Sequence, residues 1–314
     1  MYQILSIDGG GIYGTLFASQ LMKLEAANPG FLAEIDLVAG TSIGGIIALG
    51  IADEIPMNEI LQMFIERSNG IFSRTFLRRM LYLIGLKAKY SNENLKAILT
   101  EKFKDRALYD LKKKVVIPSF QIQSDGQWHE KVFHNFERIG GCPYPMVQKG
   151  SLGESVVDVG LATSAAPTFF PAYDIFIDGA VSQNNPSAQA LAFTQDDNFW
   201  GKTSFPLEEI KLFSIGCNYS GDEIKRSSMD WGYLKWIKYI FKIMIRGNMV
   251  SSDYQCRQLL NHETYFRYCP NLPKELSKEL DSVELVKDLV DFNDEKQFER
   301  ASEWIKKNWF THNP

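Results

Sequence analysis

Two short apolar runs near the amino terminus each lead into a glycine-rich turn and then into a helical pattern. The runs are Ile4–Ile7 and Leu37–Ala39, and the turns are Asp8–Gly14 and Gly40–Gly44. A strand followed by a helix is the unit from which parallel sheets are built, because the helix carries the chain back across one face of the sheet. We therefore expect an α/β protein whose mostly parallel central sheet is covered by helices on both faces.

Later apolar runs continue this pattern along the chain. Further strands are expected at Lys114–Gln123, Val132–His134, Ile175–Ile177 and Lys211–Ile215. The chain has 314 residues and contains no internal repeat, low-complexity tract or linker. A single domain over residues 1–314 is therefore predicted, in which residues 272–314 form a tail of two amphipathic helices.

The composition narrows the class of protein. With 45% hydrophobic and 23% charged residues, the chain can bury a large core. Its net charge of -4 and pI of about 5.7 argue against a protein that binds nucleic-acid polymers, since contacts to phosphates require a basic surface. No apolar stretch approaches the roughly 20 residues of a membrane-spanning helix.

The cysteines and histidines show no metal-binding or disulfide pattern. The four cysteines are Cys142, Cys217, Cys256 and Cys269. None of them forms a C-x-x-C pair, and the histidines are scattered, so no metal is expected. Free thiols and the lack of a charged export leader favour a cytoplasmic protein.

Ser42 stands in the middle of the second glycine turn, between an expected strand and an expected helix. Such a sharp turn strains the backbone, and Gly40 and Gly44 leave room where larger side chains would collide. The helix that begins after Ser42 also directs N–H groups and the positive end of its dipole at negative charge. These features predict a nucleophile. For this motif alone, a packing turn with an incidental serine is the alternative.

The first glycine turn, Asp8–Gly14, has the features of an anion cradle. Its three consecutive glycines leave no Cβ to block a substrate oxygen, and the turn opens a helix. It also matches the dinucleotide pattern G-x-G-x-x-G through Gly9, Gly11 and Gly14. A dinucleotide site needs an acidic residue about 20 positions further on, at the end of the second strand. That strand ends instead at Ala39 and leads to the serine turn, which favours an oxyanion cradle.

The histidines offer no convincing proton acceptor for Ser42. His262 occupies the place of the histidine in the chain order of α/β-hydrolases, but its polar setting is typical of a surface residue. His129 and His134 precede the candidate carboxylate in the chain, and a core or surface role explains either of them.

Asp178 is the stronger candidate for the base. It ends the apolar run Ile175–Ile177, and Gly179 and Ala180 after it let the backbone pass close to a neighbour. A carboxylate with an ordinary pKa of about 3.9 is a weak base in water, so direct proton transfer from a serine requires a dry, preorganised site. The alternative is a structural aspartate that caps a turn.

Taken together, these motifs resemble those of the patatin-like phospholipase family. The oxyanion motif D-G-G-G-x-x-G is matched by Asp8–Gly14, the nucleophile elbow by Gly40–Gly44, and the base motif by Asp178–Ala180. Other segments that resemble the family are Ala162–Pro167, Asn184–Pro186 and the region from Trp231 to Tyr254. The similarity extends over about residues 2–268, which we take as the core of the domain.

The resemblance implies a three-layer α/β/α fold related to the α/β-hydrolases, and a catalytic Ser–Asp dyad. Ser42 would be the nucleophile and Asp178 the general base, without a metal or organic cofactor. The other implied site residues are the oxyanion donors Gly9, Gly10 and Gly11 and the supporting residues Asp8, Gly14, Gly40, Gly44, Gly179 and Ala180. The family often has Arg or Lys where this chain has Tyr13, so the family's head-group preference is not carried over.

The implied activity is hydrolysis of fatty-acyl esters, as in a phospholipase A or lysophospholipase. The sequence leaves two alternatives open. One is an effector of the same fold that degrades membranes only after a small nucleotide or a protein partner activates it. The other is a storage or binding protein with little turnover, because a fold does not determine an activity.

Two basic segments rich in apolar residues are candidates for contact with a membrane that contains the lipid substrate. The first, Tyr233–Arg246, is expected to carry its cations on one helix face: Lys235, Lys238, Lys242 and Arg246. The second is Phe72–Lys89. Each can lie in a membrane interface and attract anionic lipids, or can pack on the core and expose its cations to water.

Overall fold

The computed structural model describes residues 1–122, 126–137, 154–200, 204–218 and 230–310. Cys142 lies outside these ranges. Within them, a mixed sheet has the strand order β4-β3-β2-β1-β6-β7, and β5 pairs with β3 beside this path. The strands are β1 (Tyr2–Ile7), β2 (Leu37–Gly40), β3 (Lys114–Gln121), β4 (His129–His134), β5 (Phe176–Asp178), β6 (Ile210–Ile215) and β7 (Tyr265–Tyr268).

The central part of the sheet is parallel and its β3 side is antiparallel. Strands β1, β2, β3, β6 and β7 run in one direction, whereas β4 and β5 both pair antiparallel with β3. The predicted α/β class with a mostly parallel sheet is therefore confirmed. No strand was expected after Lys211–Ile215, but β7 extends the sheet beyond β6. Its charged Arg267 obscures the short strand pattern in the sequence.

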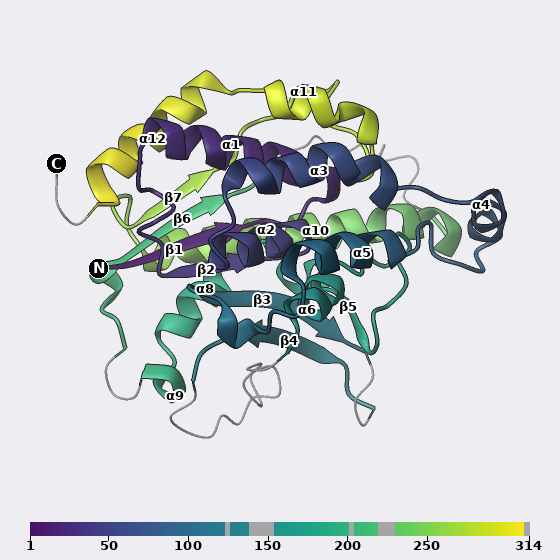
Figure 1. The fold of residues 1–314 in the computed structure, drawn as a ribbon, viewed down its shortest axis with the longest axis horizontal. Coiled ribbons are helices and arrows are strands. Elements are labelled where there is room, and N and C mark those ends of the chain that lie inside the picture. Colours follow the sequence, from purple (N-terminus) through teal and green to yellow (C-terminus); the bar gives the residue numbers. More distant parts are fainter. Residues whose placement is uncertain (123–125, 138–153, 201–203, 219–229, 311–314) are drawn as a thin grey trace.

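Helices cover both faces of the sheet (Figure 1). The α-helices are α1 (Gly14–Ala27), α2 (Ile43–Ala52), α3 (Met57–Ile71), α4 (Phe76–Leu83), α5 (Glu93–Phe103), α6 (Val156–Thr163), α7 (Ala180–Gln183), α8 (Ser187–Thr194), α9 (Asp197–Trp200), α10 (Tyr233–Leu259), α11 (Val286–Asp291) and α12 (Glu295–Asn308). The 3-10 turns are Gly11–Tyr13, Leu108–Asp110, Leu207–Glu209 and Val283–Leu285.

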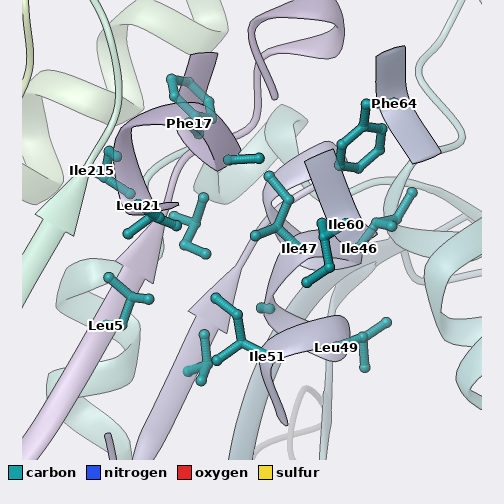
Figure 2. Close-up of a cluster of buried hydrophobic side chains, with 14 of the residues drawn as sticks. Leu5, Phe17, Leu21, Ile46, Ile47, Leu49, Ile51, Ile60, Phe64 and Ile215 are labelled. Atoms are coloured by element: carbon teal, nitrogen blue, oxygen red, sulfur yellow. The ribbon is translucent and has the colours of Figure 1, made fainter. Parts of the chain in front are cut away.

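Alternate side chains of each central strand enter two different hydrophobic clusters. On β1, Leu5 belongs to the cluster under α1, α2 and α3, while Ile4 belongs to the cluster under α8 and the end of α10. Figure 2 shows the first cluster, where Leu5 and Ile215 from the strands meet Phe17 and Leu21 from α1. The period of two in the strands thus produces the three layers.

The carboxyl-terminal segment packs against α1. The Ser19 hydroxyl donates to the Val290 carbonyl at 2.8 Å, and the Gln20 side chain donates to the Phe292 carbonyl at 2.7 Å. Trp309 is fully buried beside Phe31. The first α-helix of the predicted helical tail begins only at Val286, because the backbone before it contacts the first glycine turn instead.

Candidate active site

Ser42 lies at the junction of β2 and α2 in a left-handed backbone conformation, with φ of 55°. The conformation is rare for a residue with a side chain, and it indicates local strain. Neighbouring backbone packs closely around it: a Cβ on Gly40 would lie 2.2 Å from the Gly44 carbonyl oxygen, and one on Gly44 would lie 2.4 Å from the Asp8 carbonyl oxygen. The two glycines are therefore required by close approach of the backbone.

The Ser42 hydroxyl donates a hydrogen bond of 2.7 Å to Oδ2 of Asp178. The other carboxylate oxygen, Oδ1, accepts from the Ala180 backbone amide at 2.8 Å, which fixes the orientation of the carboxylate. Asp178 reaches Ser42 because β5 runs antiparallel to β3 and places Asp178 opposite Ser119. The structure thus brings together the two side chains that the sequence singled out.

Asp178 is 1% exposed, and burial dominates its protonation. Burial raises the pKa of its carboxyl from 3.8 to about 7, although the hydrogen bonds from Ser42 and Ala180 act in the opposite direction. A pKa near neutrality suits a general base that works at neutral pH.

No histidine of the described residues hydrogen-bonds to Ser42 or Asp178. His134 is buried on β4 among aromatic rings, and its Nδ1 accepts from the Phe136 amide. His262 is exposed. The hydrogen-bond partners of Ser42 agree with a base that is a carboxylate.

The first glycine turn faces the same cavity as Ser42. The Gly9 amide donates to the Asn184 carbonyl at 2.9 Å. It was expected to be an oxyanion donor, but in this structure it is not free to bind an oxyanion. The amides of Gly10 and Gly11 have no acceptor among the described residues, and both glycines line the cavity. The geometry therefore moves the candidate oxyanion donors to Gly10 and Gly11.

Asp8 begins this turn and is buried against Arg267 of β7. The guanidinium forms a two-pronged ion pair with the carboxylate and also donates to the Ser214 hydroxyl at 2.7 Å. Burial disfavours the charge of Arg267, but the Asp8 carboxylate prevails and raises the pKa of the guanidinium above its ordinary value. Sequence reasoning missed Arg267, although a buried aspartate in the motif implies a cationic partner.

Tyr13 connects the first glycine turn to the carboxyl-terminal segment. Its hydroxyl contacts the Leu276 and Lys278 carbonyls at 3.1 and 3.0 Å and accepts from the Lys278 amide at 2.9 Å. The residue before Tyr13 contacts the same segment, because the Ile12 amide donates to the Leu280 carbonyl at 2.8 Å. Tyr13 is fully buried and does not line the cavity, so it acts on the loop rather than on a substrate head group.

Two further hydrogen bonds hold the site, and they involve Thr163 and Asn184, to which the sequence assigned no role. The Ser42 amide donates to the Thr163 hydroxyl at 3.0 Å, and the Asn184 side chain donates to the Gly9 carbonyl at 3.1 Å. Both residues fall in the segments that resembled the family motifs around Asp178. The sequence motifs therefore indicated that these segments matter, but they did not indicate which hydrogen bonds Thr163 and Asn184 form.

A largely apolar cavity opens from the dyad. It contains about 770 Å³ of empty space, part of it open to solvent, and Ser42, Asp178, Gly10 and Gly11 lie on its wall. Its apolar lining comes from Ile12, Ile43, Ile46, Phe64, Ile71, Phe72, Leu95, Ala166, Phe169, Phe170, Ala180, Phe241, Ile245 and Leu280. Its size and lining are those of a site for an apolar ligand. Within the described residues, no cluster of three or more His, Cys, Asp or Glu side chains is placed to hold a metal.

The chain belongs to the patatin-like phospholipase family, whose model matches residues 5–191. A cGAMP-activated phospholipase of Pseudomonas aeruginosa is 31% identical over 293 residues, covering 91% of this chain and 83% of that protein. A putative sporulation hydrolase of Bacillus subtilis, CotR, is 29% identical and covers 98% of both chains. A cGAMP-activated phospholipase of Vibrio cholerae is 28% identical, covering 88% of this chain and 84% of that protein.

Among solved structures, ExoU of Pseudomonas aeruginosa, in complex with SpcU, is similar with a TM-score of 0.42 and 12% identity, covering 98% of this chain and 52% of that one. VipD of Legionella pneumophila has a TM-score of 0.37 and 10% identity, covering 92% of this chain and 66% of that one. The family assignment depends on the sequence matches.

Proposed function

We propose that this protein is a lipid acyl hydrolase of the phospholipase A or lysophospholipase type. The observation that carries the proposal is the 2.7 Å hydrogen bond between Ser42 and the buried Asp178, at the wall of a largely apolar cavity. An activated serine accounts for ester cleavage, and the apolar lining suits a fatty-acyl chain.

The first half of the reaction forms an acyl-enzyme. Asp178 accepts the hydroxyl proton as Ser42 Oγ attacks the ester carbonyl carbon. The amides of Gly10 and Gly11 donate to the oxygen that becomes negative, and the amino-terminal end of α2 adds favourable electrostatic potential. When the tetrahedral intermediate collapses, the alcohol portion of the lipid leaves with the proton from Asp178.

The second half releases the fatty acid. Asp178 accepts a proton from a water molecule that attacks the acyl-Ser42 ester, and the same two amides stabilise the second tetrahedral intermediate. Collapse returns the proton to Ser42 Oγ and frees the carboxylic acid. One carboxylate thus serves as base and then as acid in each half.

A lipid digest with the Ser42→Ala variant tests this function. We expect release of fatty acid from phospholipid or lysophospholipid to fall to background, together with labelling by a fluorophosphonate probe. Ser68→Ala is the matched control, because Ser68 is another serine on the cavity wall, it is buried, and it is not hydrogen-bonded to Asp178. Absence of labelling in the unmodified protein would instead favour a storage or binding protein.

We also propose that a cyclic dinucleotide activates the enzyme. The support comes from the names of two relatives, each described as a cGAMP-activated phospholipase. Fatty-acid release should be higher with cGAMP than without it. The control is the linear dinucleotide that forms when the cGAMP ring is hydrolysed. Equal turnover in both samples would contradict activation by this nucleotide.

A further inference from the structure

Helix α4 (Phe76–Leu83) carries an apolar face that nothing in the described chain covers. None of the side chains of α4 is buried. Figure 1 shows the helix at the outer edge of the molecule, beyond the ends of α3 and α5. The exposed fractions of the apolar side chains in and after α4 are 79% for Phe76, 68% for Leu77, 47% for Met80, 68% for Leu83, 63% for Ile84 and 70% for Leu86.

The helix periodicity gathers three of these side chains on one side. Phe76, Met80 and Leu83 recur at spacings of four and three, which places them on a common face. The opposite side turns towards the rest of the protein, since Arg78 is partly buried there and donates to the Tyr90 carbonyl. The apolar face of α4 therefore points away from the protein body and into solvent.

The segment that carries this face is positively charged, although the chain as a whole is acidic. Residues 72–90 contain five cations and no carboxylate, in a chain of net charge -4. Lys89 is paired with Asp281. Arg79 and Lys87, in contrast, are exposed and take part in no ion pair with any described residue. Exposed apolar residues beside free cations fit an anionic lipid surface, where each cation contributes to attraction and the apolar side chains enter the interface.

The basic face of α10, the other candidate from the sequence, is less available. Lys242 is paired with Glu279 at 2.7 Å, and Arg246 donates to Asn218 at 2.7 Å. Lys235 lies over the Trp231 ring. The side chain of Lys238 is not among those described. The structure therefore favours α4 over α10 as the basic element that meets a membrane.

The position of α4 connects this surface to the cavity. Phe72, which ends the turn after α3, lines the cavity and packs against Tyr90 and Phe170. Phe76, the first residue of α4, follows only four positions later in the sequence. An acyl chain that leaves a bilayer at α4 would thus reach the cavity close to Phe72.

We propose that α4 and the following turn dock on an anionic bilayer, with the apolar face of α4 in the interface and Arg79 and Lys87 near lipid head groups. The substrate side of this proposal depends on the proposed lipid hydrolysis, whereas the docking does not. A second copy of the chain is a poorer occupant, because pairing two α4 faces would bring two segments of five cations together.

Vesicle sedimentation of the Ser42→Ala protein tests docking without hydrolysis. The vesicles are phosphatidylcholine alone or with one quarter phosphatidylglycerol. We expect binding to the mixed vesicles, and about tenfold or greater weakening when Phe76→Ser and Leu83→Ser are combined. The matched control combines Tyr109→Ser and Trp128→Ser, because these side chains are 63% and 73% exposed elsewhere on the surface. This control should bind as strongly as its parent.

A second pair of variants tests the charges. Arg79→Gln with Lys87→Gln should weaken binding to the mixed vesicles and reduce its dependence on salt, whereas Lys287→Gln with Lys296→Gln should leave both unchanged. Equal binding by the α4 variants and their controls would overturn the proposal. A dimer in light scattering that Phe76→Ser and Leu83→Ser dissociate would also overturn it, by showing that the face binds a second copy.

Turnover of a short-chain soluble ester separates this proposal from the proposed function. With Ser42 intact, the α4 variants should hydrolyse that ester at the unmodified rate and lose activity only on vesicles. If no variant hydrolyses any ester while vesicle binding behaves as expected, the hydrolase function fails and the docking surface stands.

Discussion

At the scale of single residues, Asp178 combines burial with the negative charge that its proposed role as a general base requires. Its pKa of about 7 means that the base is half protonated near neutral pH. We expect kcat/KM on a soluble ester to fall about tenfold for each pH unit below 7 and to level off above it, because the proposed mechanism requires unprotonated Asp178. A rate measured from pH 5 to 9 checks this. A flat profile down to pH 5 would exclude Asp178 as the titrating base.

The same pKa shift predicts a stability effect. Between about pH 4 and pH 7, the carboxyl of Asp178 is mostly protonated in the folded protein and mostly ionised in the unfolded chain, where its pKa is about 3.9. The carboxyl's stabilising contribution is therefore present below about pH 4 and is lost as pH rises through 7. Asp178→Asn avoids this loss, so its advantage in unfolding free energy should grow by about 2 to 3 kcal/mol between pH 5 and 8.

Urea denaturation of Asp178→Asn and the unmodified protein at both pH values measures the difference. The exposed Glu303 provides the control variant Glu303→Gln, for which no such change with pH is expected. A constant difference between the two proteins across this range would mean that Asp178 is ionised throughout.

At the scale of secondary-structure elements, the start of α2 depends on glycine packing. A Cβ at Gly44 would lie 2.4 and 2.5 Å from the carbonyl oxygens of Asp8 and Ile7, which are backbone atoms and cannot easily move. We expect Gly44→Ala to lower the free energy of unfolding by about 3 kcal/mol. Gly70→Ala in α3 meets no neighbour and should instead raise it by about 0.5 to 1 kcal/mol. Denaturant unfolding of both variants checks the contrast.

The elements that the sequence predicted well are those with local signals. The β1 and β2 strands show apolar runs that end in glycine turns, and the structure confirms these strands and the parallel sheet they start. Strand β7 was missed because it is short and holds Arg267, whose buried charge is paired with Asp8, 259 positions away. Such a long-range partner leaves no local pattern.

In the candidate site, too, the features with a local sequence signal were predicted and those that depend on distant residues were not. Motif spacing singled out Ser42 and Asp178, which the structure places in contact. The use of the Gly9 amide could not be predicted, because it depends on the Asn184 carbonyl from a distant part of the chain. The antiparallel direction of β5 also depends on its pairing with β3 rather than on its own three residues.

At the scale of the whole molecule, the carboxyl-terminal segment is part of the main core. Trp309 is fully buried, contacts the ring of Phe31 and donates to the Phe31 carbonyl at 3.0 Å. We expect Trp309→Ala to destabilise the protein by about 3 to 5 kcal/mol and to shift a single unfolding transition. Trp128→Ala, at a side chain that is 73% exposed, should change stability by less than about 0.5 kcal/mol.

Circular dichroism and tryptophan fluorescence, followed in the same denaturant series, measure this effect. Coincident transitions are expected, because the segment after β7 and the sheet share one hydrophobic cluster. Two separated transitions would show that residues 272–310 unfold as an independent unit.

The hydrogen bond from Ile12 to Leu280 also has a consequence for biosynthesis. A ribosome makes Ser42 and Asp178 long before it makes Leu280, which closes over the glycine turn. The nascent chain therefore carries both reactive groups while the wall that Leu280 provides is still missing. The wall of the cavity is therefore completed only late in translation, after Leu280 has been synthesised.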